Sequence, residues 1–213
     1  MITDSAQMKP DPYNNNPKIP FGSPNRYTTT HDPTHKAIFF PPDSTTGPPP
    51  LPSYSAGGMV IHDAWTTHTT PLSFTSDADI SLLTRHQSSP LSGVWFPSPG
   101  ETLLRYCDWP PLSTIPLHRT ETLDLGVCVA GEMELALDSG ERRTLLPGDV
   151  IVQRGAMHAW RNPSATEWAR VVFFLVGAEA VRVSGGVVMR GFLPWAGGGG
   201  ERLGEKCEKE RGR

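Results

Sequence analysis

Polar and apolar residues alternate in the centre of the chain, between His118 and Asn162. Side chains two apart on a β-strand project from the same face, so a strand that starts at His118 would carry two contrasting faces. One face would be polar and would line a cavity: His118, Thr120, Thr122 and Asp124. The other would be apolar and would pack on another layer, either the N-terminal strands or a second subunit: Leu123, Leu125, Val127 and Val129.

Further short β-type runs flank this centre, with turn signals between them. The runs RYTTT and KAIFF enclose Asp32-Pro33 and predict a hairpin within residues 26–40. Asp138-Ser139-Gly140 predicts a tight turn between the runs MELAL and ERRTLL. Seven or more short strands at regular spacing indicate an all-β sandwich or small barrel. The other expected elements are strands at 59–65, at 94–106 with a break at 97–100, at 150–153 and at 171–176, and one helical turn within 77–85.

Both ends of the chain differ from this β-rich centre. Residues 1–25 are polar and spaced by prolines, which predicts a disordered, irregular N-terminal arm. Residues 41–58 are rich in proline and predict a loop that cannot join a hydrogen-bonded ladder. Residues 181–213 are glycine-rich and charged, and predict a flexible C-terminal tail. The folded domain is therefore expected at 26–180, with its barrel core at about 95–178.

The composition narrows the class of protein. At 213 residues the chain has room for one ordinary domain, and its 21 glycines and 22 prolines leave little room for long helices. A net charge of −3, without a basic stripe or polybasic run, argues against nucleic acid or an anionic membrane surface as a partner. The sequence has neither a run of 18 apolar residues nor the apolar part of a secretion signal. Because Cys107, Cys128 and Cys207 form no C-x-x-C pair, we expect a reducing, cytoplasmic location.

His118, Asp124 and His158 form the candidate chemical centre of the chain. A polar stripe inside a small barrel needs partners, because an unpaired buried polar group costs about 1–3 kcal/mol. A divalent metal would satisfy all three side chains. Two histidines with one carboxylate match the facial triad of non-haem iron sites, and Zn, Mn or Ni would also fit. The alternative is that each histidine is a hydrogen-bonded core or surface residue, with Trp160 as core or pocket wall.

Two segments resemble the cupin motifs. The stretch PGDVIVQRGAMHAWRN is similar to the second motif, with a Gly-Asp turn, a short strand, a glycine bend, a histidine and an asparagine. Those positions are Gly148, Gly155, His158 and Asn162. The first motif maps onto His118, Thr120, Asp124 and Gly131, with its remaining spacings intact. The chain departs from the pattern where Thr120 replaces the second metal histidine, Asp124 replaces glutamate, and Gln153 replaces the usual proline with one residue fewer before it.

Several segments, in the same order, resemble a narrower group over about residues 26–178: RYTTTHDPTHKAIF, LLRYCDWPP, HRTETLDLG and GDVIVQRGAMHAWRN. These are small fungal single-cupin-domain proteins, some of them cupin-domain oxidoreductases encoded with aromatic polyketide pathways. The resemblance implies a cupin jelly-roll barrel, also called a double-stranded β-helix.

The resemblance also implies a metal-assisted, oxidoreductase-type enzyme that acts on an aromatic or polyketide-derived small molecule in secondary metabolism. The three candidate ligands would hold Fe, Mn, Zn or Ni and carry the catalysis. Arg105, Thr120 and Trp160 would contact the substrate, with Arg105 and Trp160 orienting an anionic or aromatic group. A homodimer is a further expectation, because cupins often exchange N-terminal strands and the apolar face of the central strand needs a cover.

Two alternatives stay open. Thr120 in place of a metal ligand favours a metal-free cupin that binds a small ligand or serves as a pathway accessory. A metal-independent isomerase, cyclase or decarboxylase would instead use His118 or His158 as general acid or base. Asp124, one methylene shorter than glutamate, would then hydrogen-bond Thr120 or a histidine rather than a metal.

Overall fold

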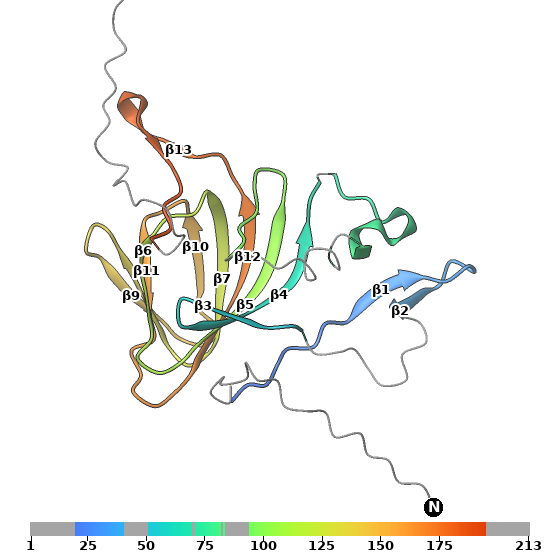
Figure 1. Ribbon diagram of the computed structural model, residues 1–213, viewed down its shortest axis with the longest axis horizontal. Coiled ribbons are helices and arrows are strands. Elements are labelled where there is room, and N and C mark those ends of the chain that lie inside the picture. Colours follow the sequence, from blue (N-terminus) through green and yellow to red (C-terminus); the bar gives the residue numbers. More distant parts are fainter. Residues whose placement is uncertain (1–19, 41–50, 70, 82, 84–93, 195–213) are drawn as a thin grey trace, which may run out of the picture.

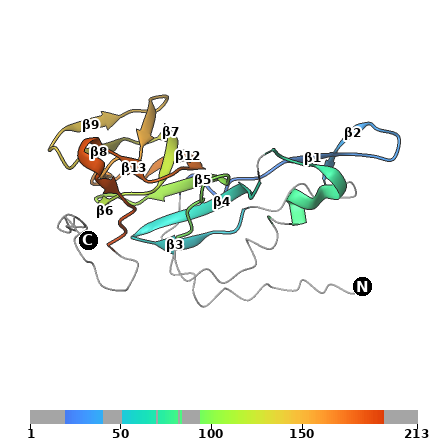
Figure 2. The same cartoon turned by 90° about the horizontal axis from the view of Figure 1, so that it is seen from above.

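The protein is a barrel of two antiparallel sheets that face each other, as Figures 1 and 2 show. The computed structural model describes residues 20–40, 51–69, 71–81, 83 and 94–194. One sheet has the strand order β10-β7-β12-β5-β4-β3, and the other has the order β6-β11-β8-β9. The expected all-β jelly-roll barrel is therefore confirmed.

The barrel strands are short, and each is bounded by a turn or a loop. In chain order they are β3 (Tyr54–Ala56), β4 (Met59–Thr67), β5 (Thr102–Trp109), β6 (Thr114–His118), β7 (Thr122–Ala130), β8 (Met133–Leu137), β9 (Arg142–Leu145), β10 (Val150–Arg154), β11 (His158–Arg161) and β12 (Ala169–Gly177). Outside the barrel lie β1 (Thr28–His31), β2 (Ala37–Phe40), β13 (Val181–Arg182), β14 (Val188–Met189) and the 3₁₀ turns η1 (Thr75–Asp77) and η2 (Ser184–Gly186).

The core lies between the two sheets, because alternate residues of each strand point inward. Trp109, Trp160 and Phe173 form its aromatic centre, with ring centroids 5.7 Å apart for Trp160 and Phe173 and 6.2 Å apart for the other two pairs. Burial of such a side chain contributes about 1.5–3 kcal/mol to stability. The aromatic centre therefore clamps the sheets together and forms the base on which the polar site is built.

The polar stripe comes from two strands rather than one. A strand that starts at His118 was the condition for one shared face, and it is not met, because β6 ends at His118 and β7 begins at Thr122 in the opposite sheet. Between them, the backbone of Arg119 exchanges two hydrogen bonds of 2.9 and 2.8 Å with Phe192. This distant pairing interrupts the ladder. The side chains of the stripe are nevertheless all buried: His118, Thr120, Thr122 and Asp124.

The apolar face of β7 points to solvent. Leu125 and Val127 are each 37% exposed and Val129 is 45% exposed, whereas a core position would be covered. Exposed apolar side chains of the neighbouring strands extend this face: Val150, Val152 and Phe174. The N-terminal strands were one expected cover, but β1 and β2 pair only with each other in a separate sheet beyond β4 (Figure 1). A second subunit remains as the predicted cover.

We expect the protein to sediment at twice its monomer mass of 23.3 kDa, with this sheet face buried between two copies. Val127→Lys places a charge at the centre of the face and should shift the mass to that of the monomer in analytical ultracentrifugation. Leu112→Lys is the control, because Leu112 is also an exposed apolar residue, at 58%, but lies in a loop away from the face. A monomeric wild-type protein would contradict the dimer.

The described parts of the two terminal segments contact the barrel. Arg170 of β12 donates a 2.9 Å hydrogen bond to the carbonyl of Gly22 and lies over the ring of Phe21, so residues 20–25 are tied to the barrel. At the other end β13, η2 and β14 form a hairpin, and Phe192 then pairs with Arg119. The described residues 20–25 and 181–194 therefore contact the barrel, and the domain boundaries at 25 and 181 stay predictions. Residues 1–19 and 195–213 lie outside the described residues.

Other local predictions had mixed outcomes. The hairpin within 26–40 is confirmed by the antiparallel pair β1 and β2. The loop at 41–58 was wrong at Tyr54–Ala56, which pairs with β4, and residues 41–50 lie outside the described chain. The strand expected from Val94 begins only at Thr102, after the turn at Gly100. Residues 78–81 are helical, and no helix in the described chain has the length and apolar character to cross a bilayer.

Candidate active site

A cavity of about 60 Å³ lies inside the barrel, between its two sheets. All six residues singled out from the sequence line it, so the structure brings the whole predicted set together: Arg105, His118, Thr120, Asp124, His158 and Trp160. The rest of its wall is apolar or aromatic and includes Trp109 and Phe173. The cavity therefore has an aromatic body and one polar end.

The two histidines face each other across neighbouring strands. His158 begins β11 and is paired in register with His118, the last residue of β6. Their ring centroids are 4.1 Å apart and their planes meet at 53°. Each Nδ1 lies 2.9 Å from the carbonyl oxygen two residues earlier, of Pro116 and Ala156. A carbonyl only accepts, so each Nδ1 carries the proton and each neutral ring has an acceptor at Nε2.

Burial keeps both rings neutral. It lowers the pKa of His118 below the ordinary value for histidine. Burial, followed by the neighbouring His118, lowers the pKa of His158 to about 3. At neutral pH the pair therefore offers hydrogen-bond acceptors and no positive charge.

Asp124 is the carboxylate at the polar end of the cavity. It projects from β7, and its Oδ1 accepts a 2.5 Å hydrogen bond from the hydroxyl of Thr122. The Thr122 hydroxyl also lies 2.7 Å from that of Thr120, and since Thr122 has one proton to give, Thr120 donates to Thr122. Burial raises the pKa of Asp124 to about 6, although the neighbouring hydroxyls of Thr122 and Thr120, the charge of Arg105 and the amide of Gln153 oppose the rise. Asp124 is ionised at neutral pH and can take up a proton easily.

Gln153 is a site residue that the sequence marked only as a departure from the cupin motif. It lies opposite Asp124 in the pairing of β10 with β7 and donates a 3.1 Å hydrogen bond from Nε2 to Oδ2. The same Nε2 is 3.0 Å from Nδ1 and 2.9 Å from Nε2 of His158. Because Cε1 lies between the two nitrogens of His158, an atom in the ring plane could not be this close to both of them. Nε2 of Gln153 therefore lies over the face of the ring. This is an N–H···π contact that does not use the in-plane lone pair of His158.

The side chains do not match the expected three-ligand metal site. Among the residues that the structure describes, no three His, Cys, Asp or Glu side chains are placed to hold one ion. The Asp124 oxygens are directed to Thr122 and Gln153, and no contact joins them to either histidine in the described chain. Asp124 would have to move relative to His118 and His158 for the three side chains to hold one ion. The divalent metal therefore stays a prediction.

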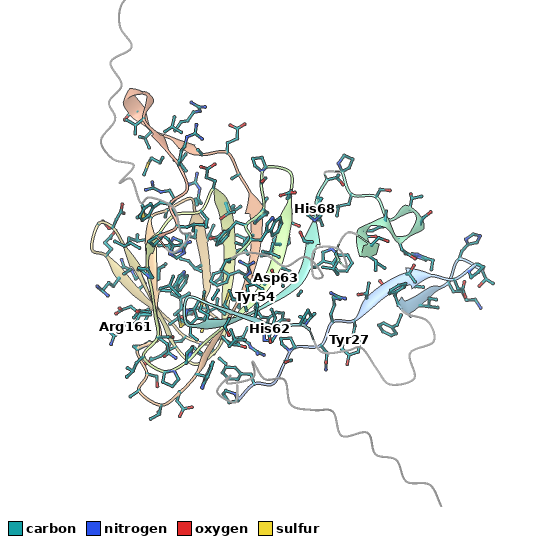
Figure 3. All side chains as sticks on the ribbon, viewed as in Figure 1. Tyr27, Tyr54, His62, Asp63, His68 and Arg161 are labelled. Carbon is teal, nitrogen blue, oxygen red and sulfur yellow. The ribbon has the colours of Figure 1, made fainter. Side chains whose placement is uncertain are left out.

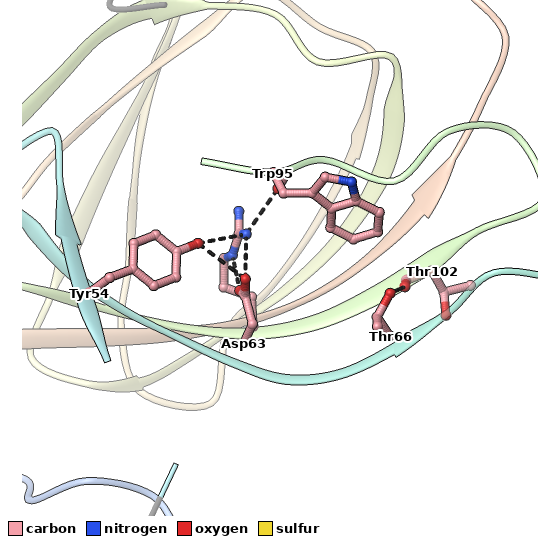
Figure 4. A network of polar contacts seen from close by, with 6 residues as sticks. Tyr54, Asp63, Thr66, Trp95 and Thr102 are labelled. Atoms are coloured by element: carbon pink, nitrogen blue, oxygen red, sulfur yellow. Dashed lines mark hydrogen bonds and ion pairs between the residues drawn. The ribbon is translucent and has the colours of Figure 1, made fainter. Parts of the chain in front are cut away.

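Arg105 lines the cavity and belongs to a buried polar network with Tyr54, Asp63 and Trp95, three residues that Figure 4 labels. Its Nε donates to Oδ1 of Asp63 at 2.6 Å, and its Nη2 donates to Oδ2 at 3.1 Å. Nη2 also donates to the Tyr54 hydroxyl at 3.0 Å and to the Trp95 carbonyl at 2.9 Å. Asp63 compensates the charge of Arg105, so an anionic substrate has no net positive charge to meet here.

Tyr54 and Asp63 are functional-site neighbours that sequence reasoning missed. Both lie near β3 and β4 at the side of the barrel, as Figure 3 shows. Burial raises the pKa of the Tyr54 phenol, which stays protonated and donates to Asp63 at 3.1 Å. The sequence MVIHDAW does not predict whether the side chain of Asp63 points into the barrel or out of it. Nearly every residue of β4 is buried, so the strand has no clear polar face. No local signal could have found this pair.

The fold and the two motifs at the polar end of its cavity define a cupin. No family model matches the chain. Phomopsin biosynthesis cluster protein D of Diaporthe leptostromiformis is 40% identical over 164 residues, which are 76% of this chain and 83% of that protein. Cupin-domain-containing oxidoreductase srdB of Neurospora crassa is 30% identical over 189 residues, which are 85% and 91%.

The chain belongs to the family of fungal cupin-domain-containing oxidoreductases that includes the Neurospora protein. Among solved structures, an RmlC-like cupin from Shewanella frigidimarina is 12% identical and covers 60% of this chain and 85% of that one. The TM-score of that match is 0.40. The resemblance expected from the sequence is confirmed.

Proposed function

We propose that this cupin is an enzyme of fungal secondary metabolism that binds an aromatic or polyketide-derived small molecule in the barrel. Its residues would move a proton at carbon. The names of the relatives support the setting: one is an oxidoreductase and another a biosynthesis cluster protein. The single observation that carries the chemistry is a carboxyl group of pKa about 6 at the polar end of an otherwise aromatic and apolar cavity. A general base works best when its pKa lies near the working pH.

Asp124 is the base in this proposal. It takes the proton from a carbon next to a carbonyl group, and the C–H electron pair forms the carbon–carbon double bond of an enolate. Thr120 lines the same cavity, and we assign its hydroxyl, which turns its single proton from Thr122 to the substrate, as the donor to the carbonyl oxygen. The neutral Nε2 atoms of His118 and His158 accept hydrogen bonds from substrate hydroxyls. Isomerisation and cyclisation of polyketides share such a proton transfer, so the proposal covers one of the alternatives. Oxidation of the substrate would in addition need an oxidant that takes two electrons from the enolate.

Deuterium uptake tests the base. Acetophenone incubated with the protein in D₂O should gain deuterium at its methyl carbon, as measured by mass spectrometry. Asp124→Asn should slow this exchange about 10²- to 10⁴-fold, the usual contribution of a general base. Asp138→Asn makes the same change on an exposed turn and should keep the wild-type rate. No exchange above the protein-free rate in the wild type would leave the metal-free binding cupin as the better assignment.

Elemental analysis tests the metal prediction separately. If the protein holds a divalent ion at His118, Asp124 and His158, the purified wild type should contain close to one equivalent of Fe, Mn, Zn or Ni. His158→Ala removes one of three ligands and should lose most of that metal. Equal metal content in the two proteins would rule out this site. The assay does not depend on a substrate, so its outcome is independent of the exchange experiment.

A further inference from the structure

The inner cavity alone does not enclose an aromatic substrate. Its volume is about 60 Å³, whereas an apolar cavity of about 150 Å³ is needed to hold benzene and ligand pockets usually reach about 300 Å³ or more. A second cavity of about 330 Å³ adjoins it. Phe96 and Thr120 line both cavities, so these two side chains form the partition between them. The larger, outer cavity therefore has the room that the inner one lacks.

Arg119 is a buried cation in the wall of this outer cavity. Its side chain is 7% exposed, and its Nε is enclosed without a hydrogen-bond partner. Within the described chain it forms no ion pair and no side-chain hydrogen bond. Its backbone exchanges two hydrogen bonds with Phe192, which fix the place at which the side chain leaves the chain. A buried charge without a partner is costly, and the usual remedy is an opposite charge that binds there.

The nearby carboxylate is already engaged. Glu121 lines the same cavity, but its Oε1 accepts a 2.9 Å hydrogen bond from the backbone N–H of Gly191. That bond holds the C-terminal segment, which contributes Gly191 and Leu193 to the cavity wall. Glu121 also adds negative charge beside Arg119, which favours a singly charged ligand over a dianion such as phosphate. The two arginines differ in this respect, because the guanidinium of Arg105 is compensated by Asp63.

We propose that Arg119 binds a carboxylate group of the substrate in the outer cavity. The proposal rests on the proposed function and narrows its substrate class to aromatic or polyketide-derived carboxylic acids. The planar guanidinium suits a carboxylate, because two parallel N–H···O bonds can form. The ring of the ligand contacts Phe96 and Leu193, and its reactive carbon extends past Thr120 towards the inner cavity. An anionic group is thus recognised by Arg119, and Arg105 takes no part in its recognition.

Binding of benzoate and benzamide to the full-length protein tests the proposal. The two probes have the same ring and similar size, and only benzoate is charged. By titration calorimetry the wild type should bind benzoate at least tenfold more tightly than benzamide. Arg119→Gln should lower the benzoate affinity at least tenfold and leave the benzamide affinity unchanged. Arg161→Gln makes the same change in charge on an exposed residue, at the end of the barrel strand β11, that lines neither cavity, and should alter neither affinity (Figure 3).

Arg119→Lys is the control for a loss of binding that is caused by misfolding of the Arg119→Gln protein. It retains the charge but not the planar fork, so it should bind benzoate with an affinity between those of the wild type and Arg119→Gln. Equal affinity of the wild type for the two probes, or equal benzoate affinity of the wild type and Arg119→Gln, would overturn the proposal. If either result occurs while acetophenone still gains deuterium at the normal rate, only the carboxylate site is contradicted and the proposed function is supported. If the wild type binds benzoate selectively but exchanges no deuterium, the carboxylate site at Arg119 is supported and the proposed proton transfer is contradicted.

Discussion

Acid should destabilise the wild-type protein strongly, and most of this sensitivity should disappear when His158 is replaced by Leu. The pKa of His158 is about 3 in the folded protein, against 6.5 for an ordinary histidine. A histidine of lowered pKa adds stability above pH 6.5, and this stability is lost as the pH falls towards 3, because the unfolded chain binds the proton first. The full effect is about 5 kcal/mol, of which about 3 kcal/mol is lost by pH 4.

Urea denaturation at pH 7 and pH 4 measures this effect. The drop in unfolding free energy between the two values should be about 3 kcal/mol larger in the wild type than in His158→Leu. The raised pKa of Asp124 has the opposite effect on stability. A carboxyl group of raised pKa adds its full stabilisation below pH 3.8, and this stabilisation is lost as the pH rises to about 6. This term is present in both proteins and cancels in the comparison. Equal drops in the two proteins would show that His158 is solvated or already charged.

Asp63→Ala should lower the unfolding free energy by about 3–5 kcal/mol, because it leaves the guanidinium of Arg105 buried without its counter-charge. The two side chains are 6% and 4% exposed, and their closest contact is 2.6 Å. Tyr54 also loses an acceptor for its hydroxyl. The double variant Asp63→Ala/Arg105→Met removes both charges and should recover most of the loss, since the cost arises from the unpaired charge.

The chain supplies a matched control for this pair. Arg142 and Glu134 form an ion pair with the same 2.6 Å contact, but Arg142 is 62% exposed. Glu134→Ala should therefore cost less than about 1 kcal/mol. Urea denaturation of the three variants beside the wild type gives the comparison. An Asp63→Ala protein as stable as Glu134→Ala would mean that water reaches Arg105.

Local pattern predicted much of the fold. The hairpin of β1 and β2 could be read from two β-type runs around Asp32-Pro33, because turn chemistry acts over a few residues. The buried stripe was also read correctly as a set, although its strand was not. The break after His118 comes from the pairing of Arg119 with Phe192, which are far apart in the chain. A periodicity rule has no access to such a partner.

The site residues also divide into those that the local sequence predicted and those that depend on distant partners. His118, Asp124 and His158 were found because their spacing resembles the cupin motifs, and all three line the cavity. Gln153 was noted only as a departure, yet it holds Asp124 across 29 positions of sequence. Arg105 was expected to meet an anion, whereas Asp63, 42 positions away, already compensates its charge.

The amino-acid sequence by itself determined the all-β class, the alternation that buries a polar stripe, and the residues that gather at one end of the barrel. These follow from side-chain period and motif spacing, which are local properties of the chain. Only the tertiary structure decided which sheet each residue joins, what each polar atom contacts, and which charge is left without a partner. Those outcomes depend on hydrogen bonds and burial between distant segments. That is why Arg119, unremarkable in the sequence, becomes the buried cation of the outer cavity.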